Sequence, residues 1–348
     1  MKKTIVALAV AAVAATSANA ATVYNQDGSK VEVNGSVRVL LEKAKDKRTD
    51  LKDNGSRIVF KGKQDLGNGL SALAYSELRF SAKEDVLDAQ GKKVKNFKGD
   101  TVKKDRFGND VTLRRLYAGF AYEGVGTLTF GKQLTIGDKV GYSDYSYLYG
   151  GIGKPLDQGD RVINFASDSF NGFSFGVGYV FEKDVAKEAA REGRGAVVAG
   201  LYERKIGDVG FKVGAGYSEQ QKSKVVNKSE KEKIFKVGGE VSYTAFAAGV
   251  DYLQSKKSGT QEKKRGIELG LQYKVNDMVK VYTVLSHVKE NKTNTQYYKT
   301  RALTLGAGYK LHKQVETFVE GGWNKTKNEN AKVVNRDRNV GVGLRVHF

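Results

Sequence analysis

The last ten residues of the chain alternate between apolar side chains and other residues. The apolar positions are Val340, Val342, Leu344, Val346 and Phe348. Successive side chains of a β-strand point to opposite faces, so this segment has one apolar face and one polar face. Chain ends of soluble proteins usually fray into polar residues, whereas this apolar face continues to the final residue. The pattern predicts a strand that faces lipid, which needs partner strands of the same kind.

The first twenty residues have the features of a secretory signal peptide. Lys2 and Lys3 form a basic start, residues 5–15 form an apolar run, and Ala18-Asn19-Ala20 is a small-residue cleavage site. The apolar run is too short to span a bilayer as a helix. We therefore expect residues 1–20 to be removed on export and residues 21–348 to form a single barrel domain. The chain has no Cys, so we expect neither a lipid anchor nor disulfides.

The composition suits long strands better than membrane helices. The chain holds 41 Gly, 18 Tyr and 16 Phe but a single Pro, and its mean hydropathy is −0.47. Proline removes a backbone donor from a strand ladder, so its scarcity favours strands. The net charge of +20 favours polyanionic partners. Because an exported chain is separated from nucleic acid, we expect phosphate-bearing lipid headgroups to fill that role.

The alternating pattern recurs in sixteen segments. These are residues 31–43, 56–65, 70–81, 111–123, 126–132, 161–168, 173–181, 195–205, 210–218, 234–244, 246–254, 266–276, 278–289, 299–311, 315–325 and 339–348. Tight turns at 67–69, 123–125, 170–172, 207–209, 276–277 and 312–314 join them on one side. Long charged connections at 83–110, 182–194, 219–233, 255–265, 290–298 and 326–338 join them on the other.

Short turns at one end and long connections at the other are typical of bacterial outer-membrane barrels. The predicted strand lengths match the roughly 9–11 residues that a tilted strand needs to cross a bilayer. An open sheet in lipid would leave unpaired backbone groups at its edges, so the sheet must close. The sequence therefore predicts an all-β fold, a 16-stranded antiparallel transmembrane β-barrel.

The phase of each strand separates two surfaces. In the segment 56–65, Ile58 and Phe60 share one face, whereas Arg57 and Lys61 share the other. A barrel of sixteen strands encloses a lumen too wide for side chains to fill. The apolar face should therefore point outward to lipid and the charged face inward to water.

Residues 133–160 differ from the other connections. They contain the acids Asp138, Asp144, Asp157 and Asp160, the tyrosines Tyr142, Tyr145, Tyr147 and Tyr149, and the only proline, Pro155. The cations in this segment are Lys139 and Lys154. The composition leaves two interpretations open, an exposed loop with a cluster of tyrosines or a loop folded into the lumen to narrow it.

The same region carries a resemblance to a known family. The motifs are Arg114-Arg115-Leu116-Tyr117-Ala118-Gly119-Phe120, Gly126 to Gly131, Gly141-Tyr142-Ser143-Asp144 and Gly150-Gly151, together with the start Thr22-Val23-Tyr24-Asn25. In this order and spacing they resemble the trimeric general diffusion porins of Gram-negative outer membranes (OmpF/OmpC type). The ending Leu311-His312-Lys313-Gln314 is most similar to the major porins of the Pasteurellaceae group.

The resemblance implies that residues 133–160 form an inward-folded constriction loop, whose carboxylates face arginines across the pore. Asp144 matches the family's loop aspartate. Arg57, Arg114 and Arg161 match three wall arginines, and Glu77 matches a wall glutamate beside them.

Two positions depart from the family pattern. The second loop carboxylate of the family falls on Leu148, so that acid is missing. Ser36 stands where enterobacterial members carry Lys, and Arg38 on the same strand face is a candidate replacement. Charged linings set ion selectivity, so we expect near-neutral or mildly anion-leaning conduction.

Arg115 does not fit strict alternation, which places it on the outward face with Tyr117. A charge at the bilayer midplane costs about 2–4 kcal/mol. In the resembling family, trimers pack through the early strands. We therefore expect Arg115 at a subunit contact rather than in lipid.

The resemblance also implies partners. We expect a homotrimer in the outer membrane, passage of ions and small hydrophilic solutes, and contact of the Lys-rich loops with lipopolysaccharide phosphates. The terminal Phe348 serves in the family as an address for the barrel-assembly machinery. Residues 22–25 are expected to bridge the seam where the last strand meets the first.

Rival functions are a substrate-specific channel and an outer-membrane enzyme. The tyrosines of 142–149 keep a specific channel open as an alternative. An enzyme would need a His near Ser or Asp at the outer rim, and of the three His only His287 falls near that rim. No Gly-x-Ser-x-Gly elbow or zinc-ligand spacing occurs in the sequence. We expect no catalytic site, metal or cofactor.

Overall fold

The computed structural model describes residues 21–80, 82–85, 92, 103–106, 111–181, 193–222 and 230–348. The expected signal peptide, residues 1–20, lies outside these residues. So do large parts of the connections 83–110 and 182–194, and the middle of 219–233.

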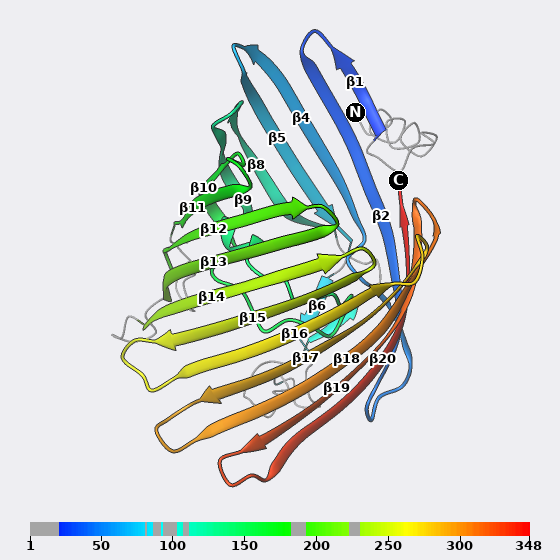
Figure 1. The fold of residues 1–348 in the computed structure, drawn as a ribbon, viewed down its shortest axis with the longest axis vertical. Coiled ribbons are helices and arrows are strands. Elements are labelled where there is room, and N and C mark those ends of the chain that lie inside the picture. Colours follow the sequence, from blue (N-terminus) through cyan, green and yellow to red (C-terminus); the bar gives the residue numbers. More distant parts are fainter. Residues whose placement is uncertain are drawn as a thin grey trace.

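All sixteen predicted strands are present, and they form a closed antiparallel barrel (Figure 1). They are β2 (Ser29–Ala44), β4 (Arg57–Gly67), β5 (Leu70–Arg79), β8 (Thr112–Tyr122), β9 (Gly126–Leu134), β10 (Gln158–Ser167), β11 (Phe173–Val180), β12 (Gly195–Ile206), β13 (Val209–Lys222), β14 (Glu230–Tyr243), β15 (Phe246–Lys257), β16 (Lys263–Lys274), β17 (Val279–Asn291), β18 (Tyr297–His312), β19 (Val315–Asn328) and β20 (Val333–His347). Each pairs with its sequence neighbour in this series, apart from the seam described below. The predicted fold class is therefore confirmed.

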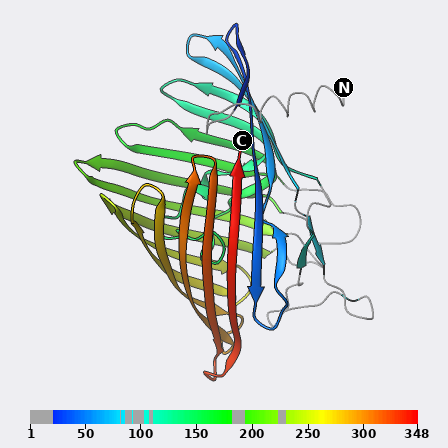
Figure 2. The same ribbon diagram turned by 90° about the vertical axis from the view of Figure 1, so that its right-hand side faces the viewer.

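The first and last barrel strands close the sheet. β20 pairs with β2 from His347 opposite Ser36 to Asn339 opposite Ala44. Figure 2 shows the two strands side by side, although almost the whole barrel domain separates them in sequence. Because closure pairs both edges, the backbone groups of β2 and β20 need no partners from lipid.

The seam continues past the end of β20. The N–H and C=O groups of Gly35 and Phe348 bond reciprocally, at 2.7 and 3.0 Å. The next part of β2 pairs instead with a short strand, β1 (Ala21–Gln26), from Val33 opposite Ala21 to Ser29 opposite Gln26. The N-terminal segment thus pairs with β2 beyond the end of β20, whereas the expected bridge from residues 22–25 to the last strand is not among the pairings of the described residues.

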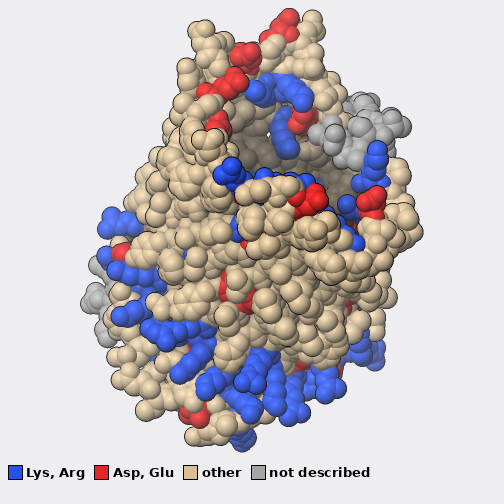
Figure 3. Space-filling view, in the orientation of Figure 1, with Lys and Arg blue, Asp and Glu red and all other residues tan. Residues whose placement is uncertain are grey.

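Exposed large apolar side chains lie on the outer face of the wall. Val37 of β2, Phe120 of β8, Val177 of β11 and Leu269 of β16 are examples. Figure 3 shows an outer surface with few charges over the middle of the strands. Lys and Arg gather toward the lower end, over the connections that join β15 to β16 and β17 to β18.

The phase of β8 differs from the prediction. The pairing of β8 with β5 shifts by one residue next to Glu77, which makes Arg114 an extra residue in β8. A β-bulge of this kind re-aims the side chains beyond it. Arg115 therefore lies on the inner face with its Nη1 2.9 Å from Glu77 Oε2, and Leu116 and Phe120 are exposed outside. The expectation that Arg115 faces a subunit contact is wrong.

Four strands were not predicted. β1 and β3 (Asp50–Asp53) add to the edges of β2, and β6 (Ala82–Asp85) pairs with β7 (Lys103–Arg106) as a separate hairpin.

Several barrel strands are longer than the segments of alternating apolar residues that predicted them. β20, for example, begins at Val333, because backbone pairing with β19 continues through charged positions that no apolar pattern marks.

One helix lies within the described residues, the single 3₁₀ turn η1 (Ile136–Lys139). None of the described residues forms a helix with the length and apolarity that a membrane crossing requires.

The seam generates a stability prediction. A Cβ atom at Gly35 would lie 2.2 Å from Phe348 Cζ, so Gly35→Ala must displace the terminal ring. We expect a loss of about 1–3 kcal/mol in the free energy of unfolding, measured by urea titration in detergent. The matched control is Gly62→Ala on the outer face of β4, where the new Cβ would meet only Ala74 Cβ at 3.7 Å. Equal stability of the two variants would contradict a role for the Gly35–Phe348 contact.

Candidate functional site

Five arginines gather on the inner wall where β20, β2, β4, β5 and β8 adjoin. They are Arg345, Arg38, Arg57, Arg79 and Arg115, and we call them the arginine ladder. Arg38 lies directly opposite Arg345, and Arg57 directly opposite Arg79. Like charges in directly opposed positions destabilise a sheet, so this arrangement needs compensation.

Glu77 supplies most of that compensation. Its Oε1 lies 2.6 Å from Arg79 Nε and 3.4 Å from Arg57 Nη1, and its Oε2 lies 2.9 Å from Arg115 Nη1. The Glu77 side chain is 1% exposed, whereas the three arginines keep about a fifth of their surface. A buried carboxylate is tolerated only when it is paired, and the guanidinium groups remain partly hydrated.

The ladder ends beside an aromatic cluster. Arg345 Nη1 lies 3.4 Å from Glu316, and its guanidinium carbon lies 4.5 Å above the ring of Tyr147. The Tyr147 ring stacks on Phe318 at 4.2 Å. Tyr147 belongs to the segment 133–160, so this contact joins the ladder region to the segment singled out from the sequence.

Apolar contacts fix the start of that segment, directly after β9, on the inner wall. Thr135 caps η1 by accepting from the N–H of Gly137. Ile136 and Val140 then pack on Val197 and Ala199 of β12. The inner face of β12 is apolar here, whereas the alternation predicted a charged face toward the lumen.

Three buried carboxylates of the wall hold the backbone of the segment. Asp251 of β15 accepts from the N–H of Tyr142 at 3.0 Å and from Ser143, and Glu268 of β16 accepts from Ser143 Oγ and Gly151 N at 2.9 Å. Glu320 of β19 accepts from the N–H groups of Tyr147, Leu148 and Tyr149 at 2.7, 3.0 and 2.8 Å.

These carboxylates lie on the polar face of their strands and are at most 1% exposed. Hydrogen bonds to charged acceptors are among the stronger ones, and three donors on one carboxylate fix the local backbone. The segment is therefore held against the polar wall over β15, β16 and β19.

Two tyrosine hydroxyls extend the attachment. Tyr145 donates to Glu240 at 2.8 Å, and Tyr149 donates to Glu42 of β2 at 2.7 Å. Burial and the carboxylate of Glu240 raise the pKa of Tyr145, and burial together with Asp251 raises the pKa of Tyr142 to about 12. The phenols are therefore neutral at physiological pH and can act as donors.

Glycines on the inner wall give the segment room. A Cβ atom at Gly270 would lie 1.8 Å from the carbonyl oxygen of Ser143, and one at Gly249 would lie 2.1 Å from that of Tyr142. Any other residue at these positions would push the segment off the wall. Glycine at polar-face positions of a strand is thus the sequence signal that marks its path.

The acids of the segment differ in environment. Asp138 pairs with Lys154 at 2.7 Å, and Asp160 pairs with Lys132 at 3.1 Å. Burial and the nearby Asp138 raise the pKa of Asp157. Asp144 is exposed, and its Oδ1 accepts from the N–H and Oγ of Ser146 at 3.0 and 2.5 Å. Within the described part of the chain, Asp144 has no cation within salt-bridge distance.

The structure brings some of the expected site residues together and separates others. Arg57, Glu77 and Arg38 lie in one cluster. Arg114 points instead to Gln158, with its Nη2 2.7 Å from the amide oxygen, and Arg115 takes the place beside Glu77. Arg161 lies in β10 on the face of Ile163, with its carbonyl bonded to the N–H of Phe181.

Several residues of the site were not singled out from the sequence. Arg79 shares the inner face of β5 with Glu77 two residues away, so strand alternation alone marks it. Asp251 and Glu268 each stand between exposed apolar neighbours in the middle of a strand, and Glu320 follows the exposed Val319. A lone carboxylate inside such a pattern is the signal that could have identified them.

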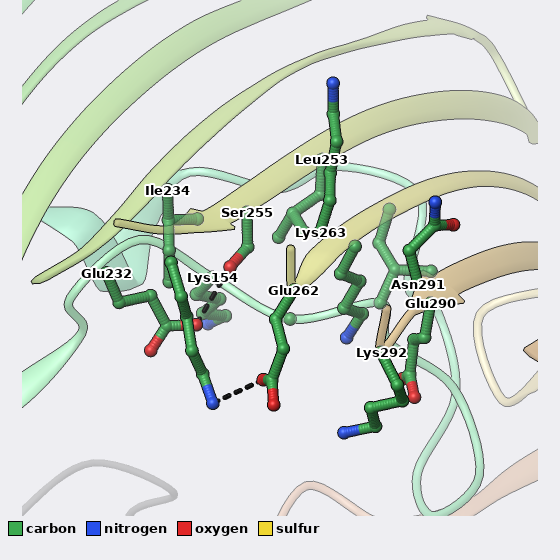
Figure 4. Close-up of a pocket in the computed structure, with 14 residues that line it drawn as sticks. Lys154, Glu232, Ile234, Leu253, Ser255, Glu262, Lys263, Glu290, Asn291 and Lys292 are labelled. Atoms are coloured by element: carbon green, nitrogen blue, oxygen red, sulfur yellow. Dashed lines mark hydrogen bonds and ion pairs between the residues drawn. The ribbon is translucent and has the colours of Figure 1, made fainter. Parts of the chain in front are cut away.

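A cavity of about 320 Å³ lies between residues 152–154 and the loop-side ends of β14 to β17 (Figure 4). Ile152, Ile234 and Leu253 form its apolar part. Around it, Lys257 pairs with Glu262 at 2.5 Å, and Ser255 donates to Glu232 at 2.8 Å.

Comparison with known proteins decides the family. The family described as Gram-negative porin matches residues 7–329 of the chain. The chain belongs to the Gram-negative porins. This porin is 61% identical to a major outer membrane protein of Pasteurella multocida over 353 aligned positions, which cover 100% of both chains. A second protein of that name and species is 58% identical over 302 positions, covering 83% of this chain and 84% of the other.

The family resemblance inferred from the sequence is thus confirmed, as is the location in the outer membrane. A porin is a channel, so the broad function is also established.

Solved structures share the fold of this porin. OmpT of Vibrio cholerae superposes with a TM-score of 0.72 at 20% identity, covering 94% of this chain and 100% of that one. An anion-selective porin from Comamonas acidovorans gives 0.71 at 18% identity, with 92% and 100% covered. Salmonella typhi OmpF in complex with daunomycin gives 0.70 at 17% identity, with 93% and 99% covered. At these identities the likeness establishes the fold alone.

The attachment of the segment generates a prediction about Glu320. Glu320→Ala removes the acceptor for three backbone N–H groups and for Tyr282 Oη, which donates at 2.5 Å. We expect the free energy of unfolding to fall by about 3 kcal/mol. We also expect a wider distribution of single-channel conductances and more open-channel noise, because the backbone of residues 147–149 is no longer held by this carboxylate.

The control is Glu203→Ala in β12, an exposed carboxylate to which no described loop amide donates. If the open-channel current noise of the Glu320 variant is no larger than that of the control, Glu320 does not hold residues 147–149 in place in the conducting channel.

Proposed function

We propose that this porin conducts ions and small hydrophilic solutes by passive diffusion through a lumen narrowed by residues 133–160. The observation that carries the proposal is the attachment of this segment to buried carboxylates on the polar wall. Side chains of the segment and of the arginine ladder would then border the same gap. Arg345 over the ring of Tyr147 supports this arrangement, because it joins the two directly.

The charges of the gap would set its selectivity. The ladder has five arginines, with Glu77 and Glu316 as their carboxylate partners. Asp144 would supply the opposing negative charge, and Leu148 replaces the second loop acid. Opposed charges across a water-filled gap create a transverse field that orients dipolar solutes. Because cations outnumber acids there, we expect near-neutral or mildly anion-leaning conduction.

Planar-bilayer recording of the purified protein tests the function. We expect stepwise ohmic conductance, and a reversal potential in a KCl gradient near zero or slightly toward the chloride potential. Strong cation selectivity would contradict the assignment of the ladder to the narrowest part. The absence of channels would contradict diffusion itself.

Single substitutions test the residues of the gap. Arg57→Ser removes one ladder charge beside Glu77, so we expect the reversal potential to shift toward cations. Arg161→Ser is the matched control, because Arg161 lies apart from the ladder on the face of Ile163. A shift in the Arg161 variant without one in the Arg57 variant would place the constriction elsewhere.

A substrate-specific channel is the second candidate. The cavity in Figure 4 favours it, because an apolar floor and paired charges could hold a solute at the outer entrance. Its signature is a current that falls with added solute and saturates. A linear dependence of flux on solute concentration supports free diffusion instead.

We also propose a homotrimer, in which the early strands form the subunit contact. A solved form of OmpT from Vibrio cholerae is described as a trimer, and this supports the proposal by shared fold. Conductance in groups of three equal steps is the expected observation.

We also propose that the C-terminal residue Phe348, whose backbone pairs with Gly35, is the recognition signal for the barrel-assembly machinery. The amount of a variant without Phe348 that reaches the outer membrane measures that role.

A further inference from the structure

A small cavity lies on the inner wall beside Tyr147, at the end of the lumen where the short turns are. It has a volume of about 190 Å³ and lies between the start of β17, the last part of β18 and the turn that joins β16 to β17. Pockets that bind drug-sized molecules span roughly 300–1,000 Å³. This cavity therefore suits a solute of only a few heavy atoms.

Three lysines from adjacent strands line the cavity. They are Lys274 of β16, Lys280 of β17 and Lys310 of β18, and we call them the lysine cluster. Lys274 lies directly opposite Lys280, and Lys280 lies opposite Gly308, two residues from Lys310 on the same strand face. Like charges in directly opposed positions destabilise a sheet, so the cluster is repulsive unless an anion lies close to it.

The acids of the cavity do not pair with the cluster. Glu316 stands opposite Lys310 across the strands, but its Oε1 lies 3.4 Å from Arg345 Nη1, and Asp277 of the turn is exposed. Among the described residues, no carboxylate lies within salt-bridge distance of the three ammonium groups. The cluster thus differs from the arginine ladder, where Glu77 is the counter-ion.

Aromatic rings take the place of a carboxylate beside Lys280. Its Nζ lies 4.5 Å from the ring centre of Tyr147 and 5.8 Å from that of Tyr282. Burial and the carboxylate of Glu316 raise the pKa of Tyr147, so its hydroxyl is neutral and adds no negative charge to the cavity. The guanidinium of Arg345 borders the same ring at 4.5 Å. The cavity therefore has a net positive charge.

Lysines recognise an anion by its charge more than by its shape. An ammonium group is a compact point charge with rotatable donors, whereas a guanidinium presents a fixed fork that matches planar or bidentate acceptors. Three ammonium groups around one small cavity attract a doubly charged anion more strongly than a singly charged one. They do not distinguish between tetrahedral oxyanions of equal charge.

We propose that the lysine cluster is a binding site for a small, doubly charged oxyanion, the class that includes sulfate and hydrogen phosphate. The proposal deepens the proposed diffusion function and rests on it, because the anion reaches the site through the lumen. Conduction of such anions then includes a bound state and saturates, whereas chloride passes without one.

The test is calorimetric titration of the purified porin in detergent with sodium sulfate, at constant ionic strength in sodium chloride. The variant is Lys274→Gln with Lys310→Gln, and both side chains are exposed, so the fold should be kept. The control is Lys61→Gln with Lys63→Gln, which removes two exposed charges from the inner face of β4. Each partly exposed ion pair contributes up to about fivefold in affinity. We expect sulfate to bind the variant roughly tenfold to thirtyfold more weakly, and the control with wild-type affinity.

Further anions test recognition by charge. Hydrogen phosphate at mildly alkaline pH should displace sulfate, whereas the same concentration of nitrate should not. Equal sulfate affinity of the variant and the wild type would overturn the proposal, as would displacement of sulfate by nitrate.

Bilayer recordings of the wild-type protein keep this inference apart from the proposed function. Stepwise channels without saturable sulfate binding would overturn the site and leave diffusion in place. Saturable sulfate binding by a protein that forms no channels would overturn diffusion and leave the site in place.

Discussion

The need to pair every backbone N–H and C=O group away from water governs this structure. A sheet in lipid cannot leave an edge, so β20 returns to β2 and the terminal Phe348 pairs with Gly35. Closure then divides each strand into a face for lipid and a face for the lumen. The alternation of the sequence, the outward position of the apolar side chains and the inward position of the arginine ladder all follow from that division.

The same requirement acts again inside the barrel. Residues 135–157 form little regular structure, so their backbone donors need acceptors that a sheet would otherwise supply. Asp251, Glu268 and Glu320 act as those acceptors, and the buried carboxylates are in turn stabilised by the donors they receive. The glycines at 249 and 270 let the chain come close enough for these bonds to form. A segment without helix or strand is thereby held in a defined place.

Strand number, order and orientation could be predicted because a period of two residues is imposed by the pleat and repeated in every strand. The bulge at Arg114 could not, because one extra residue changes no composition and reverses the phase beyond it. That single residue explains why Arg115, not Arg114, reaches Glu77. The carboxylates of the wall were missed for a different reason. Their partners are backbone groups more than 100 residues away along the chain, which no local pattern identifies.

A group of like charges lies on the inner wall of the finished barrel, and the fold compensates part of its repulsion. The arginine ladder carries its own counter-ion, since Glu77 lies between Arg57, Arg79 and Arg115. The carboxylate of Glu77 balances part of the positive charge of the ladder. The rest of that charge faces water, whose dipoles a transverse field can orient.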